Sequence, residues 1–166
     1  NVPHDPDLDA LRGVVPVFLT YVLSFVYLGI YWNNHHHMMV LTERVNGKIL
    51  WANLHLLFWL SLVPFTTAWM GENDFAEVPT AFYGADLLLA AIAYFILQTA
   101  IIAEEGPDSR LRAAIGRDLK GKVSPLLYLA AIPLAFVSPW IALAVYVFVA
   151  LIWLVPDRRI ESAVSE

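Results

Sequence analysis

Residues 123–155 read VSPLLYLAAIPLAFVSPWIALAVYVFVALIWLV, a run without a charged residue and with a Ser138-Pro139 step near its middle. A helix needs about 17–25 apolar residues to span a membrane, so this run is too long for one ordinary span and short for two. We predict a helical hairpin of two short spans that turns at Ser138-Pro139. One long kinked helix is the alternative, and it would move Arg158 and Arg159 to the opposite side of the membrane.

Three further apolar stretches precede this run, and each is long enough to span a membrane by itself. The chain is 59% hydrophobic and 15% charged, with a mean hydropathy of +0.62, whereas a soluble domain has about 25% charged residues. We therefore predict an all-α fold, a polytopic integral membrane helical bundle that forms a single transmembrane domain over residues 1–166. The expected spans lie at 13–33, 49–70, 79–103, 123–137 and 139–155.

The basic residues predict how the chain is oriented. If the spans alternate and residue 1 lies outside, all of the ten Lys and Arg residues except Arg12 lie on the inner side. Short cytoplasmic loops are enriched in Lys and Arg, so we expect the loops 34–48 and 104–122 and the C-terminus to be cytoplasmic. The inner set comprises Arg44, Lys48, Arg110, Arg112, Arg117, Lys120, Lys122, Arg158 and Arg159.

Two further expectations concern the ends of these spans. Residues 108–122 mix Arg and Lys with Leu, Ile and Ala, a pattern typical of an amphipathic helix at the inner surface. The chain begins with Asn1 and shows no signal-peptide pattern. A preceding helix would place both ends in the cytoplasm, so we expect a sixth helix upstream of the five visible ones.

Composition and motifs exclude several classes of function. The chain has no cysteine, which excludes disulfides and thiolate metal sites. It has no HExxH, Walker or dinucleotide-binding glycine motif, and no basic patch that suggests nucleic acid. We therefore expect no enzymatic activity. A TVGYG filter of the potassium-channel type is also absent.

Polar residues at the inner ends of the first two spans are the main candidate site. The two ends are neighbours in an antiparallel helix pair, so Trp32, His35, Asn53 and His55 are expected to cluster there, together with His36. An imidazole can donate from one nitrogen and accept at the other, which suits a hydrogen-bond network that braces a gate or a pore helix. The plain alternative is a set of interfacial histidines at a helix end.

A metal site at the same histidines is a rival interpretation. Zinc requires three or four donors in a fixed geometry. Three consecutive histidines on a helix, at positions 35–37, point about 100° apart and cannot all bind one ion. We therefore expect no metal site.

Asp86 is the only acidic residue well inside an expected span. Such residues are rare in membrane helices and mark either helix contacts or a functional site. Asp86 could attract cations toward a pore mouth or pair with a residue of the expected upstream helix. Alternatively, it could lie near enough to the interface to reach water. Gln98, nearer the inner side, is expected to hold two helices together.

Residues 24–39 and 50–72 contain SFVYLGIYWNNHHHMM and LWANLHLLFWLSLVPFTTAWMGE. These segments, with their Trp-Asn-Asn-His-His run, resemble the prokaryotic family of small membrane proteins related to the animal lysosomal potassium channel. The run at 123–155 is similar to the last two helices of that family, so the resemblance covers essentially the whole chain.

The resemblance implies a six-helix unit that forms a homotetramer in the bacterial inner membrane and conducts potassium as a leak-type channel. Potassium ions, the lipid bilayer and further copies of the chain are the partners it implies, with no cofactor. The family's pore-lining first helix carries an Arg-x-x-x-Phe-Ser-Asp signature, which this sequence lacks. By resemblance, Trp32, His35, Asn53 and His55 match the network that braces that helix.

Two other functions are consistent with the sequence. A proton- or metal-linked transporter could use His35, His36 and His55, because histidines titrate near neutral pH. Transporters usually show internal repeats and broken helices, and this chain shows neither clearly. A membrane scaffold without transport is the third possibility.

Overall fold

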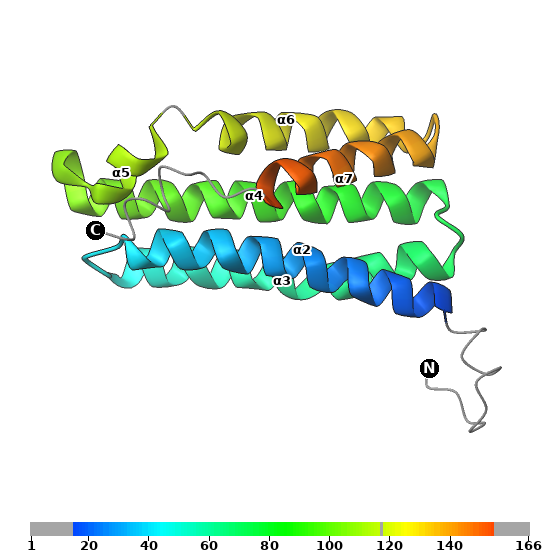
Figure 1. The fold of residues 1–166 in the computed structure, drawn as a ribbon, viewed down its shortest axis with the longest axis horizontal. Helices are drawn as coiled ribbons and strands as arrows, with labels where there is room; N and C mark the ends of the chain where they lie inside the picture. Colours follow the sequence, from blue (N-terminus) through cyan, green and yellow to red (C-terminus); the bar gives the residue numbers. More distant parts are fainter. Residues whose placement is uncertain (1–14, 117, 155–166) are drawn as a thin grey trace, which may run out of the picture.

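The computed structural model describes residues 15–116 and 118–154, and every regular element in these residues is helical (Figure 1). The expected positions of Arg12, Arg117, Arg158 and Arg159 lie outside the described residues. The elements are α2 (Val15–Val40), α3 (Gly47–Glu72), α4 (Glu77–Glu105), η1 (Gly106–Asp108), α5 (Arg110–Ile115), α6 (Leu119–Leu134) and α7 (Pro139–Leu154).

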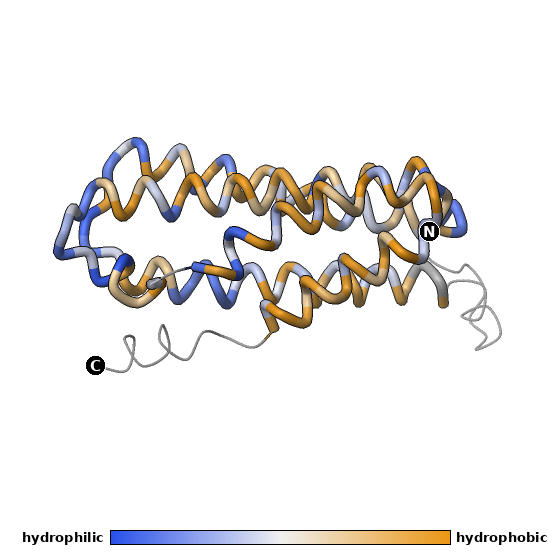
Figure 2. The backbone as a smooth tube through the Cα atoms, turned by 90° about the horizontal axis from the view of Figure 1, so that it is seen from above, coloured by the Kyte–Doolittle hydropathy of each residue, from blue (hydrophilic) through white to orange (hydrophobic). Residues whose placement is uncertain are grey.

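The five long helices lie along one common axis and alternate in direction (Figure 1). One end of the bundle carries the α2–α3 loop, η1, α5 and the start of α6, and we call it the basic end. The α3–α4 and α6–α7 turns lie at the other end, which we call the far end. Hydrophilic residues gather at the basic end (Figure 2), where Lys48, Arg110 and Lys122 lie at helix starts.

The apolar run that begins at residue 123 forms a hairpin of two helices. The last helical residue of α6 is Leu134, the chain turns at 135–138, and α7 begins at Pro139. Proline suits this first helical position because its fixed φ fits a helix and its missing N–H would have no partner there. A single kinked helix is therefore not what this part of the chain forms.

The expected amphipathic helix over 108–122 is corrected by the structure. After α5 ends at Ile115, Gly116 and Asp118 have φ values of 58° and 43°. A right-handed helix cannot continue through such residues. Asp118 instead caps α6, since its carboxylate accepts from the Gly121 N–H at 3.0 Å.

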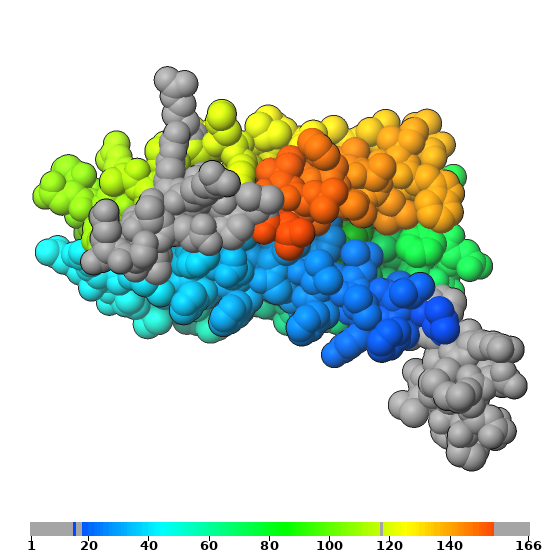
Figure 3. Space-filling model, in the orientation of Figure 1, coloured from blue at the N-terminus to red at the C-terminus, as the bar shows by residue number. Residues whose placement is uncertain are grey.

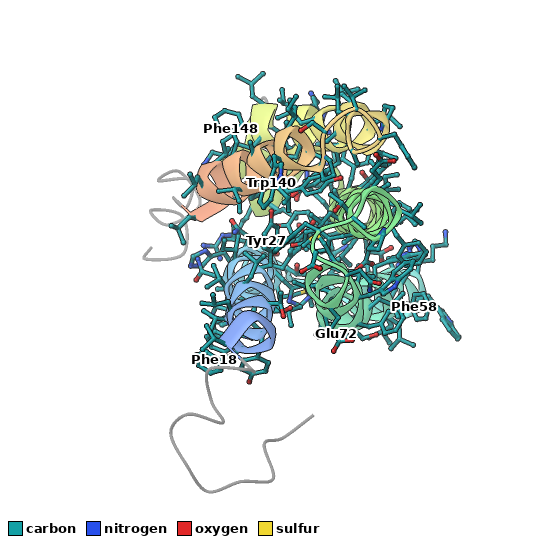
Figure 4. The ribbon with its side chains drawn as sticks, turned by 90° about the vertical axis from the view of Figure 1, so that its right-hand side faces the viewer. Phe18, Tyr27, Phe58, Glu72, Trp140 and Phe148 are labelled. Atoms are coloured by element: carbon teal, nitrogen blue, oxygen red, sulfur yellow. The ribbon has the colours of Figure 1, made fainter. Side chains whose placement is uncertain are left out.

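Four buried tyrosines join α2, α4, α6 and α7 in the half of the bundle nearer the far end: Tyr27, Tyr83, Tyr128 and Tyr146. Tyr83 contacts Tyr27 and Tyr146 edge-on, with ring centroids 6.0 and 5.6 Å away. The Tyr27 hydroxyl donates to the Tyr146 carbonyl. Figure 4 shows Tyr27 on the side of α2 that faces α7. These contacts tie the terminal hairpin to the rest of the bundle.

Aliphatic side chains form a second core at the basic half, among them Met38, Leu41, Ile49, Leu97 and Ile101. Apolar side chains also cover much of the outer surface. Phe18, Phe58 and Phe148 lie at the periphery in Figure 4, and α7 lies along α2 on the face shown in Figure 3.

Within the described residues, two helical stretches, Gly47–Glu72 and Glu77–Asp108, have the length and composition of a membrane span, and Pro139–Leu154 is a shorter apolar helix.

Candidate functional site

A hydrogen bond joins α2 to α3 near the basic end. His35 Nε2 lies 2.7 Å from Asn53 Oδ1, and both side chains are half-buried. The amide oxygen can only accept, so the imidazole donates from Nε2. A neutral imidazole then keeps Nδ1 as an acceptor, and the Asn53 amide keeps its two N–H donors. The pair therefore has capacity for a further partner of either kind.

The other candidate residues make separate contacts beside this pair. Trp32 is 65% exposed and stacks on His36, with centroids 5.4 Å apart and rings within 11° of parallel. His55 is exposed and accepts at Nε2 from Trp59 Nε1, at 2.9 Å. The structure thus brings His35 and Asn53 together, and it places Trp32 and His55 nearby on α2 and α3 without joining them into one network.

Asn34, the neighbour of His35 on α2, is a further polar contact residue that was not predicted from the sequence. Its side chain is buried and donates to the carbonyls of Ile30, at 2.8 Å, and Trp153, at 3.4 Å. The Tyr94 hydroxyl donates to the Asn34 carbonyl at 3.2 Å. Asn34 therefore connects α2 to α4 and α7. Its position between Trp32 and His35 was the one signal in the sequence.

Asp86 lies inside the bundle, on α4, and is only 3% exposed. Thr66 of α3 donates to its Oδ2 at 3.0 Å. The second carboxylate oxygen is buried and has no hydrogen-bond partner among the described residues, and the same is true of the Tyr83 hydroxyl. Asp86 therefore lies in the interior of the bundle and is not at its surface. Its role toward cations stays a prediction.

The histidines of α2 do not converge on a common point. α2 stays helical through Val40, so positions 35–37 diverge as the helix turns. Among the described residues, no three His, Cys, Asp or Glu side chains form a group that could hold a metal ion. The contacts of the candidate histidines are hydrogen bonds and ring stacking.

Gln98 joins α4 to the start of α6. Its Nε2 donates to Asp118 Oδ2 at 2.9 Å, and the side chain is buried. This is the interhelical contact expected for a polar residue inside a membrane helix. It fixes the carboxylate that caps α6.

Comparison with known proteins gives several matches. The family model of the endosomal/lysosomal potassium channel TMEM175 matches residues 1–64. A potassium channel of Chryseobacterium sp. (strain P1-3) is 50% identical over 166 residues, which cover 100% of this chain and 86% of that relative.

More distant relatives carry the same description. A potassium channel of Streptomyces collinus is 28% identical over 157 residues, covering 86% of this chain and 72% of its own. A potassium channel of Chamaesiphon minutus is 29% identical over 147 residues, which cover 83% of this chain and 71% of that relative. No solved structure matches the chain.

Proposed function

The chain belongs to the TMEM175 potassium channel family, and from this membership we propose that it is a subunit of a potassium channel. The observation that carries the proposal is the 50% identity, over the whole chain, to a potassium channel. The family is not enzymatic.

We place the bundle in the bacterial inner membrane with the basic end in the cytoplasm. Long apolar α3 and α4 support this, as do outward-facing side chains such as Phe18 and Phe148, which are 60% and 56% exposed. In lipid such side chains need no protein cover, and the helices satisfy their own backbone groups. The basic residues at one end support the orientation.

We propose a leak-type homotetramer in which His35 and Asn53 brace a pore-lining helix. Their hydrogen bond leaves donors and an acceptor unused, and it lies beside an exposed indole. Trp32, one turn before His35 on α2, is 65% exposed. A docking helix would cover this ring and use the remaining hydrogen-bonding groups. The family signature of the pore helix has no match in residues 1–166, so we assign no described residue to the ion path.

Ion flux from liposomes that contain the full-length gene product tests this function. The vesicles are loaded with potassium or with sodium, and empty vesicles serve as the control. We expect potassium efflux well above sodium efflux without any pH gradient. Equal fluxes of the two ions would contradict potassium selectivity. Flux that requires a pH gradient would instead indicate a proton-linked transporter, and no flux at all would indicate a scaffold.

A further inference from the structure

A cavity of about 30 Å³ lies between α2, α4, α6 and α7. Neither His35 nor Asn53 lines it, so it is separate from the bracing pair. Its walls combine aromatic rings, a few amide and hydroxyl groups and one carboxylate, that of Asp118. The cavity is therefore a distinct place in the bundle that could hold a small ligand.

Several hydrogen-bond donors around this cavity are already used within the protein. Trp153 Nε1 donates to Ser124 Oγ at 2.8 Å, and Gln98 Nε2 donates to Asp118 Oδ2 at 2.9 Å. The Asn34 amide and the Tyr94 hydroxyl also donate to backbone carbonyls. The one charged group of the lining, the Asp118 carboxylate, can only accept hydrogen bonds.

The acceptors lie on three of the surrounding segments. The side-chain oxygens of Asn34, on α2, and Gln98, on α4, can each accept hydrogen bonds. The Asp118 carboxylate has about four lone-pair sites, of which Gln98 and Gly121 each use one. A ligand that donates several hydrogen bonds and carries a positive charge suits this lining.

The aromatic walls favour the same kind of ligand. Tyr94 contacts Tyr31 and Trp153 edge-on, with centroids 6.3 and 5.9 Å away and rings inclined by 66° and 65°. In such a pair the edge of one ring packs against the face of the other. The face of an aromatic ring attracts a cation, most strongly for tryptophan.

We propose that this cavity binds a small primary ammonium ion. Its N–H groups would donate to the oxygens of Asp118, Gln98 and Asn34, and its carbon would lie against the rings. One water needs roughly 10–15 Å³ of such space, so the cavity takes about two heavy atoms, the size of methylammonium. Potassium ions lack the N–H donors, and tetramethylammonium lacks them as well and is too large.

Titration calorimetry with methylammonium chloride on the purified full-length protein tests the proposal. We expect saturable binding of methylammonium, and no saturable binding of tetramethylammonium or methanol at the same concentrations. Potassium bound along the ion path should be unaffected by Asp118→Asn, and potassium binding that this variant weakens as much as methylammonium binding would show a site for charge alone. Equal binding of methanol would show a neutral polar site. Either result, or no methylammonium binding, would overturn the proposal.

Asp118→Asn is the informative variant because asparagine keeps the helix cap and tolerates the left-handed backbone. It removes the negative charge, and we expect methylammonium to bind about tenfold more weakly, with the melting temperature unchanged. Asp108→Asn, at an exposed acid of the same end, is the matched control and should bind as the wild type does. Unchanged binding to Asp118→Asn would overturn the proposal.

A second variant keeps the test decisive if Asp118→Asn alters stability. Gln98→Met has a similar size and keeps the negative charge of Asp118, and it removes one acceptor together with the donor that holds the carboxylate. We expect it to weaken methylammonium binding severalfold, and unchanged affinity would count against the proposed geometry.

The same chemical group ends an ethanolamine lipid headgroup, so two sources of the ligand are compared. The titration is repeated in phosphatidylcholine vesicles with and without phosphatidylethanolamine. Methylammonium binding that is lost only with phosphatidylethanolamine would assign the site to the lipid. Binding that is unchanged by phosphatidylethanolamine would assign it to a free amine.

Discussion

Two hydrogen bonds link α3 to a neighbouring helix, and they lie in different surroundings. Thr66 donates to Asp86 at 3.0 Å in the closed interior, where both side chains are fully or almost fully buried. His35 and Asn53 meet at 2.7 Å near the basic end, and both remain half-buried. The bond lengths are similar, so burial is what separates the two pairs.

Burial decides what each pair can do. A polar group enclosed in apolar surroundings is costly if it loses its partner, so we expect the hydrogen bond between Thr66 and Asp86 to stabilise the packing of α3 against α4. The half-buried pair can form further hydrogen bonds to another helix with its remaining donors and acceptor. We therefore expect changes near Asp86 to act on subunit stability, and changes at Asn53 to act on assembly and gating.

Gly84→Ala should give the largest effect on the subunit. An added Cβ would lie 2.0 Å from the Tyr146 hydroxyl, so the tyrosine cluster beside Asp86 would have to shift. Overpacking of this kind costs about 1–3 kcal/mol. Thermal unfolding in detergent measures it. Gly29→Ala is the control, because nothing lies within 4 Å of its added Cβ, and equal losses at the two sites would contradict the packing argument.

Thr66→Val should cause the next largest loss of unfolding free energy. Valine has nearly the same shape, and the change leaves Asp86 Oδ2 without its donor, for a loss of about 1–2 kcal/mol in unfolding free energy. Thr99→Val on α4 is the control, since that exposed hydroxyl donates to the carbonyl of Phe95 in its own helix. If both variants were equally stable, the hydrogen bond between Thr66 and Asp86 would not contribute to the unfolding free energy.

The hydrogen bond between His35 and Asn53 should contribute less to the unfolding free energy. A double-mutant cycle of His35→Ala and Asn53→Ala should give a coupling of about 0.6 kcal/mol in subunit stability, the typical value for such bonds in membrane proteins. The Asn53→Ala protein should also assemble less completely, as size-exclusion chromatography would show. Asn73→Ala, at an exposed residue of the far end, should assemble normally. If it assembled as poorly as Asn53→Ala, the defect would not be specific to the half-buried pair.

His55→Ala should have the smallest effect on the subunit. Its partner Trp59 lies one turn away on the same helix and the site is exposed, so the change in unfolding free energy should stay within about 0.5 kcal/mol. Chemical denaturation provides the measurement. A loss above 1 kcal/mol would mean that His55 belongs to a network within the subunit.

The contact between His35 and Asn53 could be predicted from the sequence, whereas the contact between Thr66 and Asp86 could not. His35 and Asn53 come at the adjoining ends of two antiparallel helices, so their meeting follows from topology. The partnership of Thr66 with Asp86 depends on which face of α3 turns toward α4. Both helices are apolar on all sides, and such helices have no periodic pattern that identifies the buried face.

Other features of the fold also divide into those that a local sequence signal predicts and those that only the folded structure reveals. Ser138-Pro139 marked the hairpin turn, because proline at a helix start is a readable signal. The break between α5 and α6 depends on positive φ values at Gly116 and Asp118, and the contacts of Asp118 with Gln98 and Gly121 form only in the folded bundle. Four tyrosines from four helices converge only in three dimensions, so the sequence alone did not predict their cluster.

The most direct test of the central claim is the reversal potential of the full-length channel with potassium on one side of a bilayer and sodium on the other, for the wild type and Asn53→Ala. If the half-buried pair braces the pore helix and does not touch the ion, the variant should pass a smaller current at an unchanged, potassium-selective reversal potential. A reversal potential that moves toward zero in Asn53→Ala would contradict the account, since Asn53 would then take part in ion selection.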